Sequence, residues 1–131
     1  MQRLYISEPL VERRFPRSWQ YRILLTGSEN QELATNLLGL LYGLVDELEM
    51  HGATPLTIRL KYDAAAKVSG RITSSSTCGT IGLSRMELEV WLTFLASSLL
   101  NMATVDHIDL IDETPEGDLQ FTLAIAGRSR L

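Results

Sequence analysis

The stretch SGRITSSSTCGTIGLS, residues 69–84, holds the residue types that could supply a nucleophile. It contains the only cysteine of the chain, Cys78, among serines, threonines and glycines, just before a predicted helix. A catalytic thiol needs a histidine base, a helix N-terminus or a cation nearby to lower its pKa. The two histidines, His51 and His107, lie far away in the sequence. A small, half-buried residue in a hairpin is therefore the favoured interpretation of Cys78.

The same stretch could hold a phosphate group on the backbone N–H groups that begin the following helix. A P-loop, however, needs a lysine after its second glycine, and the stretch contains no lysine. The dinucleotide pattern Gly-x-Gly-x-x-Gly is also absent, since the glycines after Cys78 are spaced as Gly-Thr-Ile-Gly. We predict a short hairpin that closes onto a helix cap at Ser84, and no cofactor.

A second group of chemistry-bearing residues lies in the segment 106–118. His107 and Asp109 are two residues apart on a predicted strand, so they share a face and could contribute to a divalent-cation site. No second histidine and no cysteine accompanies them, so we predict no metal. Paired carboxylates act as general acid and base only where an apolar pocket raises one pKa. The simpler interpretation is a solvated acidic hairpin, without catalytic residues.

The charge of this segment indicates a binding role. Residues 106–118 contain six acidic residues and no Lys or Arg, whereas residues 1–25 contain five arginines and two glutamates. Such asymmetry bears on partners more than on fold. We predict that the acidic segment binds a basic protein partner, such as a toxin, as immunity proteins and antitoxins do; the analogy is one of charge and not of motif. The predicted partner-binding residues are Asp106, Asp109, Asp112, Glu113, Glu116 and Asp118.

The alternative function is a small enzyme or ligand-binding domain with a pocket near Cys78 and His107. An enzyme is the less favoured of the two, because no convincing catalytic set occurs. Nucleic acid is not an expected partner, although arginines and aromatic residues alternate in ERRFPRSWQYR, residues 12–22. The chain has a net charge of −4 and no base-stacking signature. Some of these arginines would instead pair with carboxylates of the chain itself, the candidates being Arg14, Arg17 and Arg22.

The composition is that of one soluble domain. The chain has 131 residues, 45% of them hydrophobic and 21% charged, and can bury a core without a disulfide or metal. A single cysteine fits a reducing compartment, so we expect a cytoplasmic protein. Charged and polar residues interrupt the apolar stretches, and the arginine-rich N-terminus does not resemble a signal peptide. We expect no membrane partner.

Hydrophobic spacing predicts two helices and several strands. Leucines at helical spacing predict a helix over about 28–50, begun by a capping box of Ser28 and Gln31. A second capping box, Ser84 with Glu87, begins a helix over about 84–103. Alternating apolar and polar residues predict strands at 20–26, 56–62, 107–112 and 119–125, the last two as a hairpin.

These elements predict an α+β fold for the whole chain, 1–131, as a single domain. Two helices cover a mainly antiparallel sheet of 4–6 strands in a two-layer sandwich, and a ferredoxin-like arrangement is the nearest common plan. Residues 1–18 lack periodicity and are expected to form an extended arm packed on or near the sheet. We find no internal sequence repeat. The helix at 84–103 is apolar on nearly every side, which predicts either deep burial or a homodimer through this helix.

Overall fold

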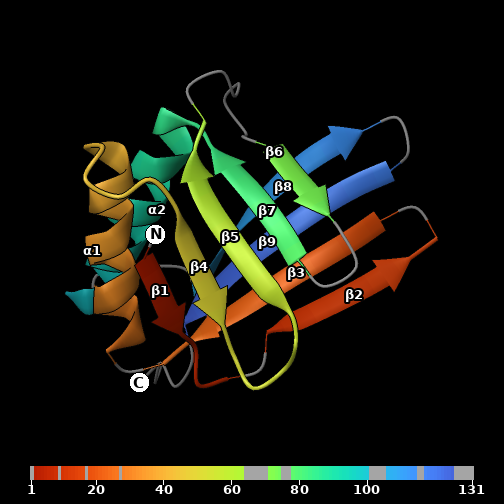
Figure 1. Ribbon diagram of the computed structural model, residues 1–131, viewed down its shortest axis with the longest axis horizontal. Coiled ribbons are helices and arrows are strands. Elements are labelled where there is room, and N and C mark those ends of the chain that lie inside the picture. Colours follow the sequence, from red (N-terminus) through yellow and green to blue (C-terminus); the bar gives the residue numbers. More distant parts are fainter. Residues whose placement is uncertain are drawn as a thin grey trace.

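The computed structural model describes residues 2–8, 10–16, 18–26, 28–63, 71–74, 78–100, 106–114 and 117–125, with the backbone alone at 71–74, 114 and 117. The elements, in chain order, are β1 (Gln2–Tyr5), β2 (Val11–Phe15), β3 (Ser18–Leu25), α1 (Glu29–Leu41), β4 (Leu48–His51), β5 (Thr57–Tyr62), β6 (Arg71–Ser74), β7 (Cys78–Leu83), α2 (Arg85–Leu99), β8 (His107–Thr114) and β9 (Gly117–Ile125). The predicted α+β class with two helices is confirmed (Figure 1).

The strands form two sheets. One has five strands in the order β1-β4-β5-β7-β6, and the other has four in the order β2-β3-β9-β8. Both are mixed, because β1 runs parallel to β4, β5 to β7 and β3 to β9. The prediction of one mainly antiparallel sheet is therefore wrong, and so is the ferredoxin-like arrangement. Alternation along a strand reports which face is buried but not which strand lies beside it.

The order ββαββ occurs twice along the chain. After β1 come β2-β3-α1-β4-β5 and then β6-β7-α2-β8-β9. Each sheet joins the first hairpin of one repeat to the second hairpin of the other, through the parallel pairs β3–β9 and β5–β7. The structural repeat has no counterpart in the residue pattern, so the sequence does not predict it.

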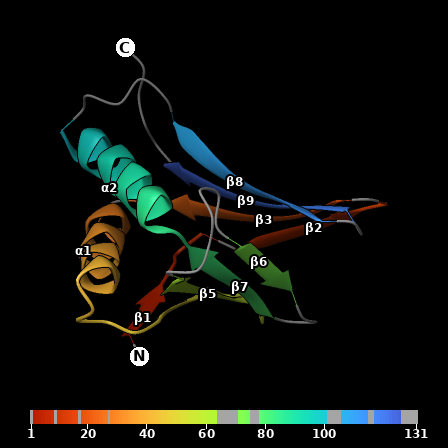
Figure 2. The same ribbon diagram turned by 90° about the horizontal axis from the view of Figure 1, so that it is seen from above.

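One core lies between the two sheets and the helices. The helices lie side by side at the end where the sheets diverge (Figure 2). Trp91 of α2 stacks on Phe121 of β9 with ring centroids 5.1 Å apart, and both rings are fully buried. Burying a side chain such as Phe121 contributes about 1.5–3 kcal/mol. This contact packs α2 against the four-stranded sheet.

Helix α1 is shorter than the leucine spacing predicts. It ends at Leu41 because Gly43 has a φ of 74°, the left-handed conformation that terminates helices. The N–H of Leu44 then donates to the carbonyl of Gly39 at 2.8 Å, which closes the last turn. Residues 48–50, which the spacing assigns to the helix, belong to β4 instead.

The two predicted capping boxes have different outcomes. Ser84 caps α2, since its Oγ accepts a hydrogen bond from the N–H of Glu87 at 3.1 Å, as predicted. Ser28 makes no side-chain cap hydrogen bond, so that prediction is wrong. The carboxylate of Glu29 instead accepts from the N–H of Thr26 and organises this end of α1. The predicted positions 101–103 of the second helix lie outside the described residues.

The N-terminal segment is not an arm, because β1 belongs to the five-stranded sheet and β2 to the four-stranded one. The predicted hairpin before α2 is confirmed as the antiparallel pair of β6 and β7. The predicted acidic hairpin is confirmed as β8 and β9, which pair as far as Thr114 and Gly117. Within the described part of the chain, neither helix has the length and apolarity that crossing a membrane requires.

Candidate functional site

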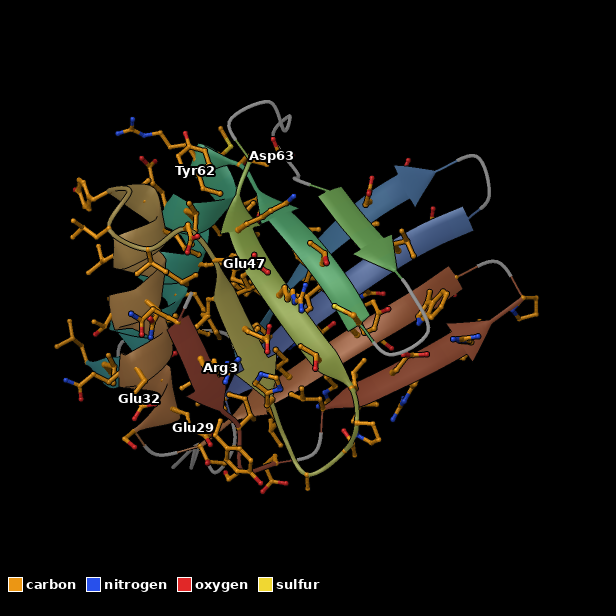
Figure 3. The ribbon with its side chains drawn as sticks, viewed as in Figure 1. Arg3, Glu29, Glu32, Glu47, Tyr62 and Asp63 are labelled. Carbon is orange, nitrogen blue, oxygen red and sulfur yellow. The ribbon has the colours of Figure 1, made fainter. Side chains whose placement is uncertain are left out.

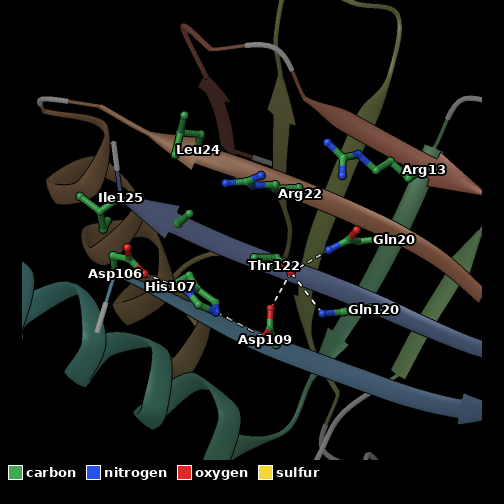
Figure 4. A pocket seen from close by; sticks show the side chains of 11 residues that line it. Arg13, Gln20, Arg22, Leu24, Asp106, His107, Asp109, Gln120, Thr122 and Ile125 are labelled. Carbon is green, nitrogen blue, oxygen red and sulfur yellow. Dashed lines mark hydrogen bonds and ion pairs between the residues drawn. The ribbon is translucent and has the colours of Figure 1, made fainter. Parts of the chain in front are cut away.

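The outer face of the four-stranded sheet, which points away from the core, carries a group of polar and charged side chains. The strand register places Arg22 of β3, Thr122 of β9 and Asp109 of β8 in one row across three neighbouring strands. Twisting of the sheet leaves a hollow of about 420 Å³ on this face, which we call the outer hollow. Its lining residues are Arg13, Gln20, Arg22, Leu24, Asp106, His107, Asp109, Gln120, Thr122, Ala124 and Ile125 (Figure 4).

The hydroxyl of Thr122 is the centre of a hydrogen-bond network on the floor of the outer hollow. It donates to Oδ1 of Asp109 at 2.5 Å. It accepts from Nε2 of Gln20 at 3.3 Å and from Nε2 of Gln120 at 3.5 Å. Thr122 itself is buried, so these bonds form on the sheet surface with little competition from water. The network holds the Asp109 carboxylate in one orientation.

His107 lies beside this carboxylate at the β8 side of the outer hollow. Its Nδ1 is 2.9 Å from Oδ1 of Asp106, and its Nε2 is 3.8 Å from Oδ2 of Asp109. Two carboxylates and one imidazole thus line one side of the hollow, where they offer acceptors for a cationic group.

Arg13 and Arg22 line the opposite side of the outer hollow. Figure 4 shows both guanidinium groups over β2 and β3, across the hollow from Asp106, His107 and Asp109. Among the residues that the structure describes, none forms a hydrogen bond or ion pair with either of them. Arg14, by contrast, pairs with Glu12 at 3.0 Å and lies over the ring of Trp19. Pairing with the chain's own carboxylates is thus confirmed for Arg14. Arg22 has no such pair among the described residues, and Arg17 lies outside them.

The predicted partner-binding residues do not form one uniform patch. Asp106 and Asp109 line the outer hollow. Glu113 and Asp118 face the same side of the sheet further along the hairpin, directly opposite each other in the register. Asp112 pairs with Leu119 and faces the other side of the sheet, where it is half-buried. The sixth predicted residue, Glu116, lies outside the described residues.

Cys78 and His107 lie on different sheets. Cys78 lies on β7 of the five-stranded sheet and is half-buried, with its Sγ 3.9 Å from Oγ1 of Thr80. The outer hollow that contains His107 has no cysteine in its lining. The histidine nearest in register is His51, because His51, Thr57 and Cys78 form one row across β4, β5 and β7. No group of three potential metal ligands occurs in the described ranges.

The five-stranded sheet carries a second charged cluster on its own outer face. Glu49 of β4 is buried and pairs with Arg59 at 3.1 Å, with Arg3 at 4.0 Å and with His51. Arg59 also approaches Glu47 at 3.5 Å. Figure 3 labels Arg3 and Glu47 of this cluster. The charges of this cluster are mutually paired, in contrast to those of Arg13 and Arg22. The sequence does not predict this cluster, because the leucine spacing assigns Glu47 and Glu49 to a helix.

Sequence reasoning also missed the centre of the outer hollow. Gln20, Thr122 and Gln120 give no signal beyond their polar positions in alternating strands. They meet only because β3 and β9, which are a hundred residues apart in sequence, pair in parallel. Comparison with known proteins adds no family, since no family model and no curated protein sequence matches the chain.

Proposed function

We propose that this chain is a small partner-binding or inhibitory protein, of the kind represented by immunity proteins and antitoxins, that binds a basic protein. The surface it would use is the acidic edge, which we define as the exposed carboxylates of Asp109, Glu113 and Asp118 on the outer face of β8 and β9. Strand β8 lies at the border of its sheet, so this surface is accessible from the side as well as from the face.

The observation that carries the proposal is the pairing of Glu113 with Asp118. The two carboxylates lie at opposed positions of one hairpin, and no described cation forms an ion pair with either of them. Like charges directly opposite each other destabilise a sheet. A basic partner surface would relieve a repulsion that the fold leaves in place, and its charge would speed association and select the partner.

Apolar anchors accompany these charges on the same face. Phe15 of β2 is 54% exposed and Ile111 of β8 is 47% exposed. Both belong to the alternating positions that point away from the core. A few buried anchors, most often aromatic residues or Arg, supply much of the affinity of protein interfaces. Charges speed association and select the partner. The place of action we propose is the cytoplasm, in keeping with the single cysteine.

The test is capture of the partner from the native host by immobilised protein, with identification by mass spectrometry. Glu113→Lys reverses a charge of the acidic edge, and Glu32→Lys makes the same change on the exposed side of α1. We expect Glu113→Lys to lose a basic partner that Glu32→Lys retains. Equal capture by both variants would remove the acidic edge from the proposal. The alternative role of the acidic edge is to keep an edge strand from pairing with other chains. Because Glu113→Lys leaves a charge at that edge, the variant would in that case still capture the partner and would not aggregate.

A homodimer through residues 84–103 is a separate proposal. Met86 and Val90 of α2 are 52% and 46% exposed, while the opposite side of the helix is buried. Sedimentation of the native protein and of Val90→Glu decides it: a dimer that dissociates in the variant supports the proposal, and a native monomer contradicts it.

A further inference from the structure

We infer that the outer hollow binds a ligand with a carboxylate at one end and a cationic group several carbon atoms away, such as arginine, either free or as the last residue of a peptide. The inference goes beyond a basic protein partner, because it assigns a specific ligand chemistry to the hollow itself.

The carboxylate would lie on the side of Arg13 and Arg22. Both guanidinium groups line the outer hollow, and neither is paired with a described residue. Two cations lining one hollow create a positive potential that an anion neutralises. Guanidinium groups bind carboxylates through two parallel hydrogen bonds, so the side chains already match this ligand group.

The cationic group would lie on the side of Asp109. The hydroxyl of Thr122 fixes one carboxylate oxygen of Asp109, and the second oxygen remains as an acceptor beside His107. The amide nitrogens of Gln20 and Gln120 point to Thr122, which leaves their carbonyl oxygens as further acceptors. This side repels a second anion, so the hollow disfavours polyanions such as nucleic acid.

The spacing of the two sides selects an extended ligand. Arg22 and Asp109 lie in one row with a single strand between them, so their Cα atoms are about 10 Å apart. The α-ammonium and α-carboxylate of one amino acid share a carbon atom, so they span less of the hollow than the two ends of arginine do. The guanidinium of arginine is far enough from its carboxylate, and Leu24 and Ala124 offer apolar contact for the methylene groups between them. The volume of about 420 Å³ falls in the range of small-molecule sites, about 300–1,000 Å³.

The experiment is a calorimetric titration of the full chain at low ionic strength with three probes. Nα-acetyl-L-arginine has the carboxylate and the guanidinium, L-arginine adds the α-ammonium, and agmatine lacks the carboxylate. We expect Nα-acetyl-L-arginine to bind one to one, and agmatine to bind about tenfold more weakly because it cannot pair with the arginines. Tighter binding of L-arginine than of its acetyl form indicates a free amino acid as the ligand, and the reverse order indicates the end of a peptide.

Three variants assign the binding to the outer hollow. Arg22→Gln and Asp109→Asn each remove one charge with little change of size. Each should weaken the binding of Nα-acetyl-L-arginine about tenfold. Arg85→Gln removes an exposed charge of α2 and should leave binding unchanged. Thermal unfolding of each variant shows that it is folded. The inference is overturned if the native chain does not bind the probe, if agmatine binds equally well, or if Arg22→Gln binds like Arg85→Gln. Because only small molecules are used, the result is independent of partner capture.

Discussion

Gly79 of β7 faces the ring of Tyr21 on β3 so closely that a Cβ atom at Gly79 would lie 2.9 Å from two ring carbons. The two residues belong to equivalent strands of the two ββαββ repeats, and they meet where the sheets pack together. Since Tyr21 is fully buried, its ring has no room to retreat. We expect Gly79→Ala to lower the free energy of unfolding by about 1–3 kcal/mol, the cost of overpacking a core. Urea unfolding followed by circular dichroism measures it.

Gly52→Ala is the matched control for this substitution. The nearest atoms to a Cβ at Gly52 are 3.4 Å away, which is ordinary contact. We expect this variant to unfold within about 0.5 kcal/mol of the native protein. If Gly79→Ala is as stable as Gly52→Ala, the Tyr21 ring does leave room for a side chain at Gly79, and the two sheets do not approach each other this closely.

The carboxylate of Glu29 joins α1 to the N-terminal segment. It accepts hydrogen bonds from the N–H of Ser7 at 2.6 Å and from the N–H and hydroxyl of Thr26 at 2.8 and 2.9 Å. Burial by itself raises the pKa of Glu29, but these hydrogen bonds outweigh it and lower the pKa below its ordinary value. At neutral pH, Glu29→Gln should therefore lower the free energy of unfolding by about 1–3 kcal/mol.

The stabilisation by Glu29 has a defined pH dependence. A lowered pKa stabilises the fold above the pKa of the unfolded chain, about 4.3, and this contribution is lost as the pH falls through the pKa of the folded state. The difference between native protein and Glu29→Gln should be largest at neutral pH and shrink below about pH 4. Glu32→Gln, on the exposed side of the same helix turn (Figure 3), serves as the control, because no described group donates a hydrogen bond to its carboxylate, and should change the free energy of unfolding at neutral pH by less than about 0.5 kcal/mol. A constant difference for Glu29→Gln across this range would contradict the assignment.

How far the sequence predicts this fold depends on the range of the interaction involved. Local signals succeed: the alternation in LTIRLKY predicts β5, and Ser84 with Glu87 predicts the start of α2. The leucine spacing fails beyond Leu41, because one positive φ at Gly43 outweighs a helical pattern that continues past it. The division into two sheets is not predictable, since any alternating strand satisfies either of them.

The candidate site shows the same division. The acidic residues are evident from charge alone, and Asp109 is placed correctly on an exposed face. Its neighbours Thr122 and Arg22 come from strands that pair over long distances, so no local pattern connects them with it. Strand alternation does separate Asp112 from Asp109 and Glu113, because it places Asp112 on the opposite face of the sheet.

The buried carboxylate of Glu49 should matter more for stability than that of its neighbour Glu47. Glu49 pairs with Arg59, Arg3 and His51, and its side chain is only 9% exposed, against 28% for Glu47. Replacing Glu49 leaves three cationic or polar groups without their common partner, so Glu49→Gln should cost about 1–3 kcal/mol. Glu47→Gln, the control, should cost less than about 1 kcal/mol. Equal effects in urea unfolding at neutral pH would show that the Glu49 cluster is an ordinary surface network.

The opposed carboxylates of Glu113 and Asp118 make a last prediction that separates stability from binding. Replacing Glu113 by lysine turns a repulsive cross-strand pair into an attractive one, which should raise the free energy of unfolding by about 0.2–1 kcal/mol. Asp118→Lys should do the same, whereas the double variant restores repulsion and should lose the gain. This double-mutant cycle, measured by urea unfolding, isolates the pair from effects on either residue alone. If the two single gains simply add in the double variant, the carboxylates do not interact. If they interact and Glu113→Lys also fails to capture the basic partner, the variant is more stable than the native protein but inactive, which is the expected behaviour of a surface whose repulsion serves binding.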